Sequence, residues 1–273
     1  MTHAWLIIAH NEFGILQRLI SALDAQECDF YVHIDKKVKQ LPKLTTKAGK
    51  LTILNDRVDV RWGSVSQIEC ELALLKAAID NGDHDYYHII SGTTLPLKPL
   101  EQIEVYFEDN AGKSILSGLC KSTPNQETLK VRRYNLFLRS YASEGFIGKT
   151  AQFLWKVSHA IQRSLGIEIN QGCVFYKASN WLSLTQEAAE YIISKETVIL
   201  KTYRYSFCGD EFFIPSELIA SPLKDNVINS EKYLLHNISR SNASTYSLNE
   251  FDGLCDTEYL FARKFIASSS KAD

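Results

Sequence analysis

Apolar positions in the first 37 residues follow a pattern typical of a parallel βαβ unit. Two short apolar runs, residues 5–9 and 30–34, flank a segment with apolar residues at three- and four-residue steps. The runs predict strands that are buried on both faces of a sheet, and the spacing between them predicts a helix. In such sheets ligands bind beyond the carboxyl ends of the strands, which here carry His10 and Asp35. We therefore predict a nucleotide site there; the alternative is an ordinary βαβ unit with polar turns.

The rest of the chain continues an alternation of strands and helices. A helix is expected from Ser66, with Glu69 completing a capping box, to a stop at Gly82. We predict strands over residues 51–54, 86–90, 114–119 and 172–176, and further helices over 100–107, 153–165 and 185–193. Residues 36–50 are expected to form a surface connection or a short helix, and residues 120–149 a loop that lines a cleft. No repeat or long linker divides the chain, which predicts one α/β domain over residues 1–273.

Composition narrows the class of protein. The chain has 273 residues, of which 45% are hydrophobic and 23% charged, as in an ordinary globular protein. A net charge of −2 gives no reason to expect nucleic acid or an anionic membrane as the main partner. No apolar run is long enough for a membrane span, and no signal peptide precedes Trp5. The six cysteines are widely spaced without a C-x-x-C pair, which predicts reduced thiols rather than disulfides or a zinc site.

Two common nucleotide motifs are absent. The turn after the first strand, residues 9–14, contains only Gly14 where a dinucleotide fingerprint requires three glycines. A Walker lysine motif is missing as well. Both observations argue against an NAD-dependent oxidoreductase and against P-loop phosphate binding.

Several short motifs resemble a known family. They occupy residues 6–11, 33–37, 62–67, 86–98, 208–213 and 260–265. In this order they resemble the core-2/I-branching β-1,6-N-acetylglucosaminyltransferases, glycosyltransferase family 14, which also contains the peptide O-xylosyltransferases. The resemblance covers nearly the whole chain, and its short length is similar to that of a bacterial member.

The resemblance implies a GT-A type fold, with a nucleotide-binding half over about residues 1–120 and an acceptor half over about 121–273. It implies inverting transfer of a sugar from a UDP-sugar to an acceptor hydroxyl. Glu211 matches the catalytic base of the family. The positions implied to bind the nucleotide are Ile8 and His10 beside the uracil, Asp35 at the nucleoside, Trp62 in place of a tyrosine, and Lys264 at the diphosphate, with Arg240 as the best candidate for an accompanying arginine.

No metal site is predicted. The one Asp-x-Asp spacing, residues 83–85, precedes a strand and so lies at the sheet edge opposite the nucleotide, where a solvated turn is expected. The family's usual Asp in the turn after that strand is replaced by Thr94. Lys264, with Arg263 or Arg240, would then offset the charge of the diphosphate in place of a metal. The alternative for Arg263 and Lys264 is a surface charge pair at a helix end.

The neighbouring acids Asp210 and Glu211 have two interpretations. One of them acts as the base, or both complement the N-terminus of the following helix. Adjacent residues point in different directions, which fits poorly with the facing carboxyl pair of a glycosidase. His33 and His88 lie inside predicted strands and are expected in the core.

The acceptor side is less defined by sequence. Arg132 and Arg133 lie in the cleft-lining segment, Asp210 neighbours the base, and Trp181 either stacks on a sugar or belongs to the core. The leading hypothesis is transfer of N-acetylglucosamine from its UDP-sugar, without a cofactor, to a surface polysaccharide or lipid-linked glycan. The alternatives are a UDP-xylose or other UDP-sugar transferase and a non-catalytic nucleotide-sugar-binding module. We expect a cytoplasmic protein, associated peripherally with the inner face of a bacterial membrane.

Overall fold

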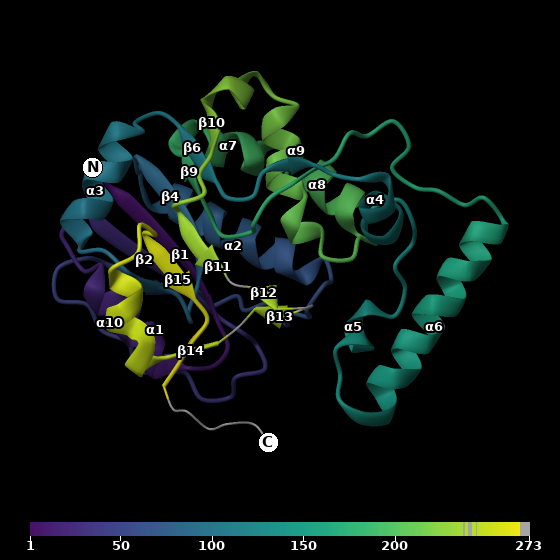
Figure 1. The fold of residues 1–273 in the computed structure, drawn as a ribbon, viewed down its shortest axis with the longest axis horizontal. Coiled ribbons are helices and arrows are strands. Elements are labelled where there is room, and N and C mark those ends of the chain that lie inside the picture. The colour runs from purple at the N-terminus through teal and green to yellow at the C-terminus, as the bar shows by residue number, and fades with distance from the viewer. Residues whose placement is uncertain (237, 240–241, 244, 268–273) are drawn as a thin grey trace.

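A seven-stranded, mostly parallel sheet forms the centre of the molecule (Figure 1). The computed structural model describes residues 1–236, 238–239, 242–243 and 245–267. The strand order is β10-β6-β9-β4-β1-β2-β3, and β9 runs antiparallel to its neighbours β4 and β6. The strands are β1 (His3–Ala9), β2 (Cys28–Ile34), β3 (Leu51–Ile53), β4 (Tyr86–Ser91), β6 (Ser114–Leu116), β9 (Leu182–Thr185) and β10 (Val227–Asn229).

Helices cover the two faces of this sheet. In the strand order given above, the chain runs from β1 to β2, toward the β3 edge, through α1 (Phe13–Ala22). From β3 it runs in the opposite direction, to β4, through α2 (Ser66–Asn81). Because such crossovers are right-handed, opposite directions of travel place α1 and α2 on opposite faces. The further helices are α3 (Leu100–Asp109), α4 (Pro124–Lys130), α5 (Leu138–Tyr141), α6 (Gly145–Ser164), α7 (Gln186–Ser194), α8 (Glu196–Tyr203), α9 (Phe213–Ile219) and α10 (Phe251–Cys255). The α/β class predicted from the sequence is confirmed.

The core confirms the predicted βαβ unit. β1 pairs in parallel with β2, and both strands are buried on both faces. Trp5 stacks on His88 with ring centroids 4.0 Å apart, and His88 donates to or accepts from Ser183 on β9 at 2.7 Å. His33 and His88 are fully buried, as predicted. Continuous apolar strands therefore form the middle of the sheet, because helices exclude water from both of its faces.

Short strands of the C-terminal segment pair in a separate three-stranded sheet with residues that follow β4. β15 (Phe261–Arg263) pairs with β5 (Leu95–Pro96) on one side and β11 (Leu234–His236) on the other. The turn after β4 thus ends in two extended residues, Leu95 and Pro96. The remaining short strands are β7 (Cys120–Lys121), β8 (Tyr176–Lys177), β12 (Ile238–Ser239), β13 (Asn242–Ala243), β14 (Tyr246–Ser247) and β16 (Phe265–Ile266).

Three local predictions are wrong. The capping box at Ser66 is absent, because the Ser66 hydroxyl accepts the Arg61 N–H and Val65 is the N-cap. The predicted strand 172–176 is replaced by the short β8, and the central strand β9 was missed. In the stretch 120–149, predicted as a loop, α4 begins at a capping box formed by Thr123 and Gln126.

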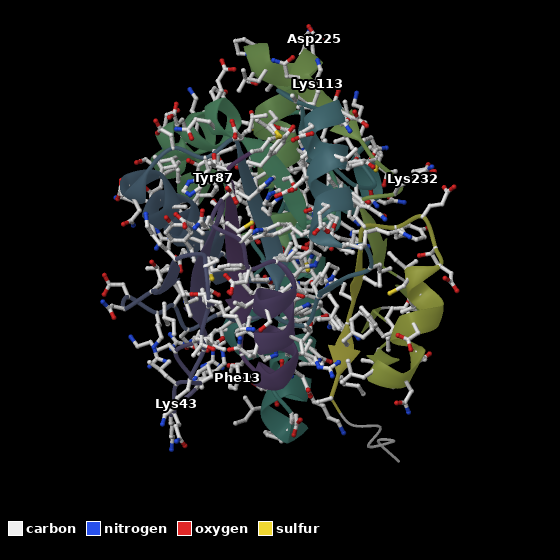
Figure 2. All side chains as sticks on the ribbon, turned by 90° about the vertical axis from the view of Figure 1, so that its left-hand side faces the viewer. Phe13, Lys43, Tyr87, Lys113, Asp225 and Lys232 are labelled. Carbon is white, nitrogen blue, oxygen red and sulfur yellow. The ribbon has the colours of Figure 1, made fainter. Side chains whose placement is uncertain are left out.

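Polar contacts fix the far edge of the sheet. Lys113 precedes β6 and donates to the backbone oxygen of Asp225 at 3.2 Å, just before β10. Figure 2 shows both residues at one end of the molecule, opposite Lys43. Residues 36–50, which contain Lys43, form a connection without a helix.

Candidate nucleotide and transfer site

The carboxyl ends of three parallel strands meet at one edge of the sheet. The Asp35 N–H donates to the Ala9 oxygen at 2.9 Å, which joins the ends of β2 and β1. The Gly92 N–H donates to the Ile8 oxygen at 2.8 Å, which adds the end of β4. A Cβ at Gly92 would lie 2.7 Å from the Ala9 side chain, so the close approach requires glycine. His10 and Asp35 are thus brought to the same edge, as the sequence predicts.

Asp35 is buried at this edge, with 5% of its surface exposed. Its two carboxylate oxygens accept from the Lys37 backbone N–H at 2.8 Å and from Lys37 Nζ at 2.7 Å. Burial lowers the pKa of His10; the charge of Asp35 opposes that shift, and those of Lys37 and Lys264 add to it. His10, Asp35, Lys37 and Lys264 therefore share one electrostatic environment.

The segment after β15 crosses the same edge. Arg263 Nε donates to Ser91 Oγ at 3.3 Å, and the Phe265 N–H donates to the Thr93 oxygen at 2.8 Å. Burial lowers the pKa of Arg263 to about 10, and burial together with Arg263 lowers that of Lys264. Arg263 is only 8% exposed, so the alternative of a surface charge pair at a helix end is wrong. Two adjacent cations lie beside the ends of β1 and β4.

Arg263 also connects this edge of the sheet to the residues around Asp210 and Glu211. Its guanidinium lies 4.6 Å from the ring centroid of Trp181, a cation–π contact. Trp181 is 8% exposed, and its neighbour Asn180 donates to Asp210 Oδ2 at 3.1 Å. The cationic segment and the Asp210–Glu211 pair therefore lie on two sides of the residues 180–181.

Glu211 faces two lysines. Its Oε2 atom lies 2.7 Å from Lys130 Nζ and 3.2 Å from Lys177 Nζ, whereas Oε1 takes part in neither ion pair. Burial acts to lower the pKa of Lys130, but the charge and hydrogen bond of Glu211, together with Cys208 and Asp210, outweigh it, so the pKa is raised. The carboxylate is 30% exposed and so remains accessible to a small hydroxyl group. Asp210 and Glu211 lie in the short 3-10 helix Gly209–Glu211 that leads into α9, not in α9 itself. Their alternative role, as acids at a helix N-terminus, therefore stays a prediction for that short helix.

Asp210 is held inside the protein beneath Glu211. Its Oδ2 accepts from Gln67 Nε2 at 2.8 Å and from Asn180. Burial first, and then the charge of Glu211, raises the pKa of Asp210 to about 7. Glu71 on α2 is fully buried nearby, and burial followed by the charge of Asp210 raises its pKa well above the usual range. Two buried carboxyl groups, of Asp210 and Glu71, therefore lie close together beneath the short turn that carries Glu211.

The loop with Trp62 packs against the same turn. The Cys208 N–H donates to the Gly63 oxygen at 2.9 Å, and a Cβ at Gly63, whose φ is +76°, would lie 2.5 Å from the Phe207 ring. Trp62 is 51% exposed and stacks on Tyr141 with ring centroids 6.3 Å apart. An exposed aromatic face is thus held beside the site by a glycine that no other residue replaces without strain.

The residues assigned to the acceptor are engaged with the protein. Arg132 pairs with Glu127 at 2.9 Å and donates to the backbone oxygen of Cys173. Arg133 donates to the Ile167 oxygen at 3.1 Å and is 7% exposed. Their contact with an acceptor, like that of Trp181 and Asp210, stays a prediction. Arg240 lies outside the described residues.

Lys130, Lys177, Gln67 and Asn180 complete the site, and the sequence analysis gave none of them a role. Lys130 lies within residues 120–149, where the sequence predicts only a loop. Lys177 directly follows the predicted strand 172–176, whereas in the structure it belongs to β8. Glu71 did carry a signal, since it falls three residues after Ile68 on the apolar face of α2.

Neither cavities nor metal ligands add to this picture. A surface cavity between α1 and α10, lined by Gln17, Arg18 and Phe251 among others, contains none of the predicted site residues. Within the described parts of the chain, no group of three His, Cys, Asp or Glu residues is placed to hold a metal ion. The Asp83–Asp85 turn lies at the start of β4, where Asp85 accepts the Thr2 N–H at 2.7 Å. It is therefore far from the carboxyl ends, as predicted.

A mostly parallel α/β sheet with polar side chains gathered at its carboxyl edge is the architecture of nucleotide-binding proteins. The chain belongs to the core-2/I-branching enzyme family, glycosyltransferase family 14, whose family model matches residues 3–248. It is 20% identical to rat xylosyltransferase 2 over 238 residues, or 83% of this chain and 26% of that protein. It is 21% identical to the xylosyltransferase oxt of Drosophila melanogaster over 214 residues, or 74% of this chain and 22% of that protein. The chain thus spans about a quarter of the length of these relatives.

Among solved structures, mouse xyloside xylosyltransferase 1 in its apo form aligns with 96% of each chain, at 10% identity and a TM-score of 0.43. Family membership agrees with the GT-A type fold that the resemblance implied.

Asp35→Ala is expected to weaken UDP binding by about 10- to 100-fold, the loss of a charge-assisted hydrogen bond. The reason is that the buried carboxylate lies where a nucleoside would meet the ends of β1 and β2. Titration calorimetry with UDP measures the change. Asp59→Ala is the matched control, because Asp59 also pairs with Lys37, at 3.3 Å, but is not at a strand end. Equal UDP affinity in folded Asp35→Ala and wild type would make Asp35 structural only.

Asp210→Asn is expected to change the pH dependence of stability. The native state raises the pKa of Asp210 from 3.8 to about 7, so between these values it binds more protons than the unfolded chain. Stability contributed by this group therefore falls as pH rises from about 4 to about 7. The melting temperature of Asp210→Asn should gain on that of wild type as pH rises through this window.

Thermal unfolding at pH 5 and pH 8 measures this difference. Asp225→Asn, at an exposed position, is the control and should follow wild type at both pH values. A constant offset between Asp210→Asn and wild type would contradict the assignment of the raised pKa.

Proposed function

We propose that this chain is an inverting glycosyltransferase that moves a sugar from a UDP-sugar to a hydroxyl of a glycan or lipid-linked acceptor. The observation that carries the proposal is the junction at residues 180–181. On one side Arg263 contacts Trp181, and on the other Asn180 contacts Asp210, next to Glu211. Cations and a carboxylate are therefore close to one another but separated, as a leaving diphosphate and an attacking hydroxyl require.

The nucleotide would occupy the carboxyl edge of the sheet. Ile8 and His10 would lie beside the base and Asp35 would accept hydrogen bonds from the nucleoside. The neutral state of His10, favoured by burial and by the nearby lysines, suits stacking or hydrogen bonding to an uncharged base. Trp62 would offer its exposed ring at the border of this site.

The charge that develops on the departing UDP would be offset by Arg263 and Lys264. Preorganised cations stabilise such a charge without a change of conformation during the reaction. This arrangement supports transfer without a metal ion, with no cofactor beyond the donor itself. Thr94, which replaces the family's usual Asp, bonds to Ser91 at 2.9 Å and is buried.

Glu211 would take the proton of the acceptor hydroxyl as its oxygen attacks the anomeric carbon. Lys130 and Lys177 hold Oε2, which fixes the direction of the carboxylate and leaves Oε1 to face the acceptor. Gln67 and Asn180 hold Asp210, and with it the turn, from below. Arg132, Arg133 and Trp181 are the proposed acceptor side.

The donor sugar is proposed as N-acetylglucosamine, with a β-1,6 linkage, from the resemblance of the motifs to the β-1,6-N-acetylglucosaminyltransferases. A second candidate is xylose, because the relatives at about 20% identity are named xylosyltransferases. A non-catalytic nucleotide-sugar-binding module is less well supported, since Glu211 is present and held in place.

One experiment separates these candidates. Thermal-shift measurements with UDP, UDP-N-acetylglucosamine, UDP-xylose and NAD should show stabilisation by the UDP compounds and none by NAD. Turnover of the stabilising UDP-sugar, followed by UDP release, should continue in EDTA. Loss of turnover in EDTA with recovery in manganese would contradict the metal-free mechanism, and stabilisation by NAD alone would contradict the proposal.

A further inference from the structure

α6 is oriented with its apolar side toward solvent. In Figure 1 the helix stands at the side of the molecule, apart from the central sheet. A surface helix usually turns its apolar stripe toward the protein. Here seven large apolar side chains are exposed, namely Phe146, Ile147, Phe153, Leu154, Val157, Ile161 and Leu165, beside exposed polar ones such as Lys149, Gln152 and Lys156. Phe146 alone is 83% exposed, and Phe153 and Ile147 are each 64% exposed.

These seven side chains form one continuous stripe. At about 100° per residue, residues 146, 153, 157 and 161 lie within a quarter turn of one another, and 147, 154 and 165 extend the same side. The sequence analysis predicted this helix from the spacing of Phe153, Val157 and Ile161. We call the set of seven residues the outer stripe.

The side of α6 that faces the protein has small or polar residues together with the indole of Trp155. Asn135 Oδ1 accepts from Trp155 Nε1 at 2.8 Å and contacts His159 Nε2 at 2.9 Å. Gln162 accepts the Tyr134 N–H at 2.8 Å and donates to the Tyr134 oxygen at 2.9 Å. The buried face thus has its own hydrogen-bond partners, so the helix is held in this orientation rather than turned by chance.

The charges on α6 are all positive. Lys149, Lys156 and Arg163 recur every seven residues, so they form one row along the flank of the outer stripe. Residues 145–167 contain no Asp or Glu. The net charge of −2 for the whole chain conceals this local excess.

An apolar stripe flanked by cations fits the surface of an anionic bilayer. Such helices lie in the interface with their apolar side among the acyl chains and their cations at the lipid phosphates. A second copy of the chain fits less well, because the outer stripe and its cationic row contain no acidic group, and Glu144 and Glu168 lie only at the two ends of this segment. No helix within the described residues is long and apolar enough to cross a bilayer, so the contact would be peripheral.

We propose that α6 is a docking surface for anionic membranes, with the outer stripe inserted and the row of Lys149, Lys156 and Arg163 at the headgroups. The helix adjoins the candidate site, since Trp155 contacts Tyr141, which stacks on Trp62. Docking therefore brings the candidate site near the membrane, with α6 between them. The proposal does not depend on the transfer reaction.

Sedimentation of the full chain with vesicles tests this proposal. Phosphatidylcholine vesicles with about one third phosphatidylglycerol should sediment the protein, and pure phosphatidylcholine vesicles should not. Binding should weaken as salt is raised from 50 to 500 mM, because surface charge is screened. The triple variant Lys149→Gln, Lys156→Gln, Arg163→Gln should bind the anionic vesicles about 100-fold less tightly.

Two further variants separate insertion from charge. Phe146→Ser with Phe153→Ser should also lose binding, whereas Val105→Ser with Val198→Ser, at positions each 55% exposed on α3 and α8, should not. Lys39→Gln, Lys43→Gln, Lys47→Gln is the matched charge control and should bind nearly as wild type. All variants should keep the wild-type melting temperature, since the changed side chains are exposed.

Failure of the wild-type chain to bind anionic vesicles would overturn the proposal, as would equal loss of binding in the matched controls. Sedimentation equilibrium without lipid tests the alternative, in which a second copy of the chain packs on the outer stripe. A dimer that Phe146→Ser with Phe153→Ser dissociates, in a chain that does not bind vesicles, would assign the outer stripe to a second copy instead.

Discussion

Glu211→Gln is expected to lower sugar transfer by about 10²- to 10⁴-fold at saturating donor and acceptor, the usual contribution of a general base. Glutamine keeps the size of the side chain and can still accept a hydrogen bond from Lys130 or Lys177, but it cannot take a proton. UDP affinity and melting temperature should stay near wild type, because the carboxylate is 30% exposed and lies outside the proposed nucleotide contacts. Initial rates of transfer, with UDP affinity measured alongside, test the assignment.

Glu217→Gln on α9 is the matched control for this variant, since it makes the same chemical change six residues away and should leave the rate unchanged. Asp210→Asn, which keeps the residue's size beneath the turn, should be the milder of the two neighbouring changes. A Glu211→Gln enzyme with near wild-type transfer would remove the catalytic assignment without affecting the nucleotide-binding one.

Lys264→Ala is expected to lower both UDP affinity and turnover, each by about 10- to 100-fold, as for a charge-assisted contact to phosphate. Lys264 follows the buried Arg263 and its charge acts on His10, which places it beside the proposed nucleotide. Calorimetry with UDP and with uridine measures the effect. Uridine lacks the phosphates, so its binding should be unchanged.

Lys232→Ala is the control for the loss of a lysine, because Lys232 is 64% exposed and pairs only with the exposed Glu258 among the described residues. If Lys264→Ala weakens uridine and UDP equally, the lysine supports the fold of the edge rather than the diphosphate. If it weakens neither, Arg263 or a residue outside the described ranges carries that role.

Residues from four separate segments contact the proposed base Glu211 or its neighbour Asp210. Lys130 ends α4, Lys177 lies on β8, Gln67 lies on α2 and Asn180 precedes β9. Each contributes one contact to the Asp210–Glu211 turn. The turn itself is short, with Cys208 at a φ of +52°, and its position depends on these contacts.

The sequence by itself determined the elements whose signal is local. The βαβ unit, the extent of α2 up to Gly82 and the Thr185 cap of α7 all follow from periodicity and capping over a few residues. The gathering of His10 and Asp35 also follows, because consecutive parallel strands end at the same edge of a sheet. The motifs added Glu211 and Lys264 as candidates, whose roles stay predictions.

Only the tertiary structure decided what joins distant segments. β9 lies antiparallel between β4 and β6. A strand of only four residues has too short a pattern for its position in the sheet to be predicted from the sequence. The lysines of Glu211 come from 81 and 34 residues away, so no spacing in the sequence relates them. For α6 the spacing fixed an apolar side but not its direction. The polar contacts of Asn135 and Gln162 turn that side outward, because hydrogen bonds satisfied inside the protein hold the opposite face.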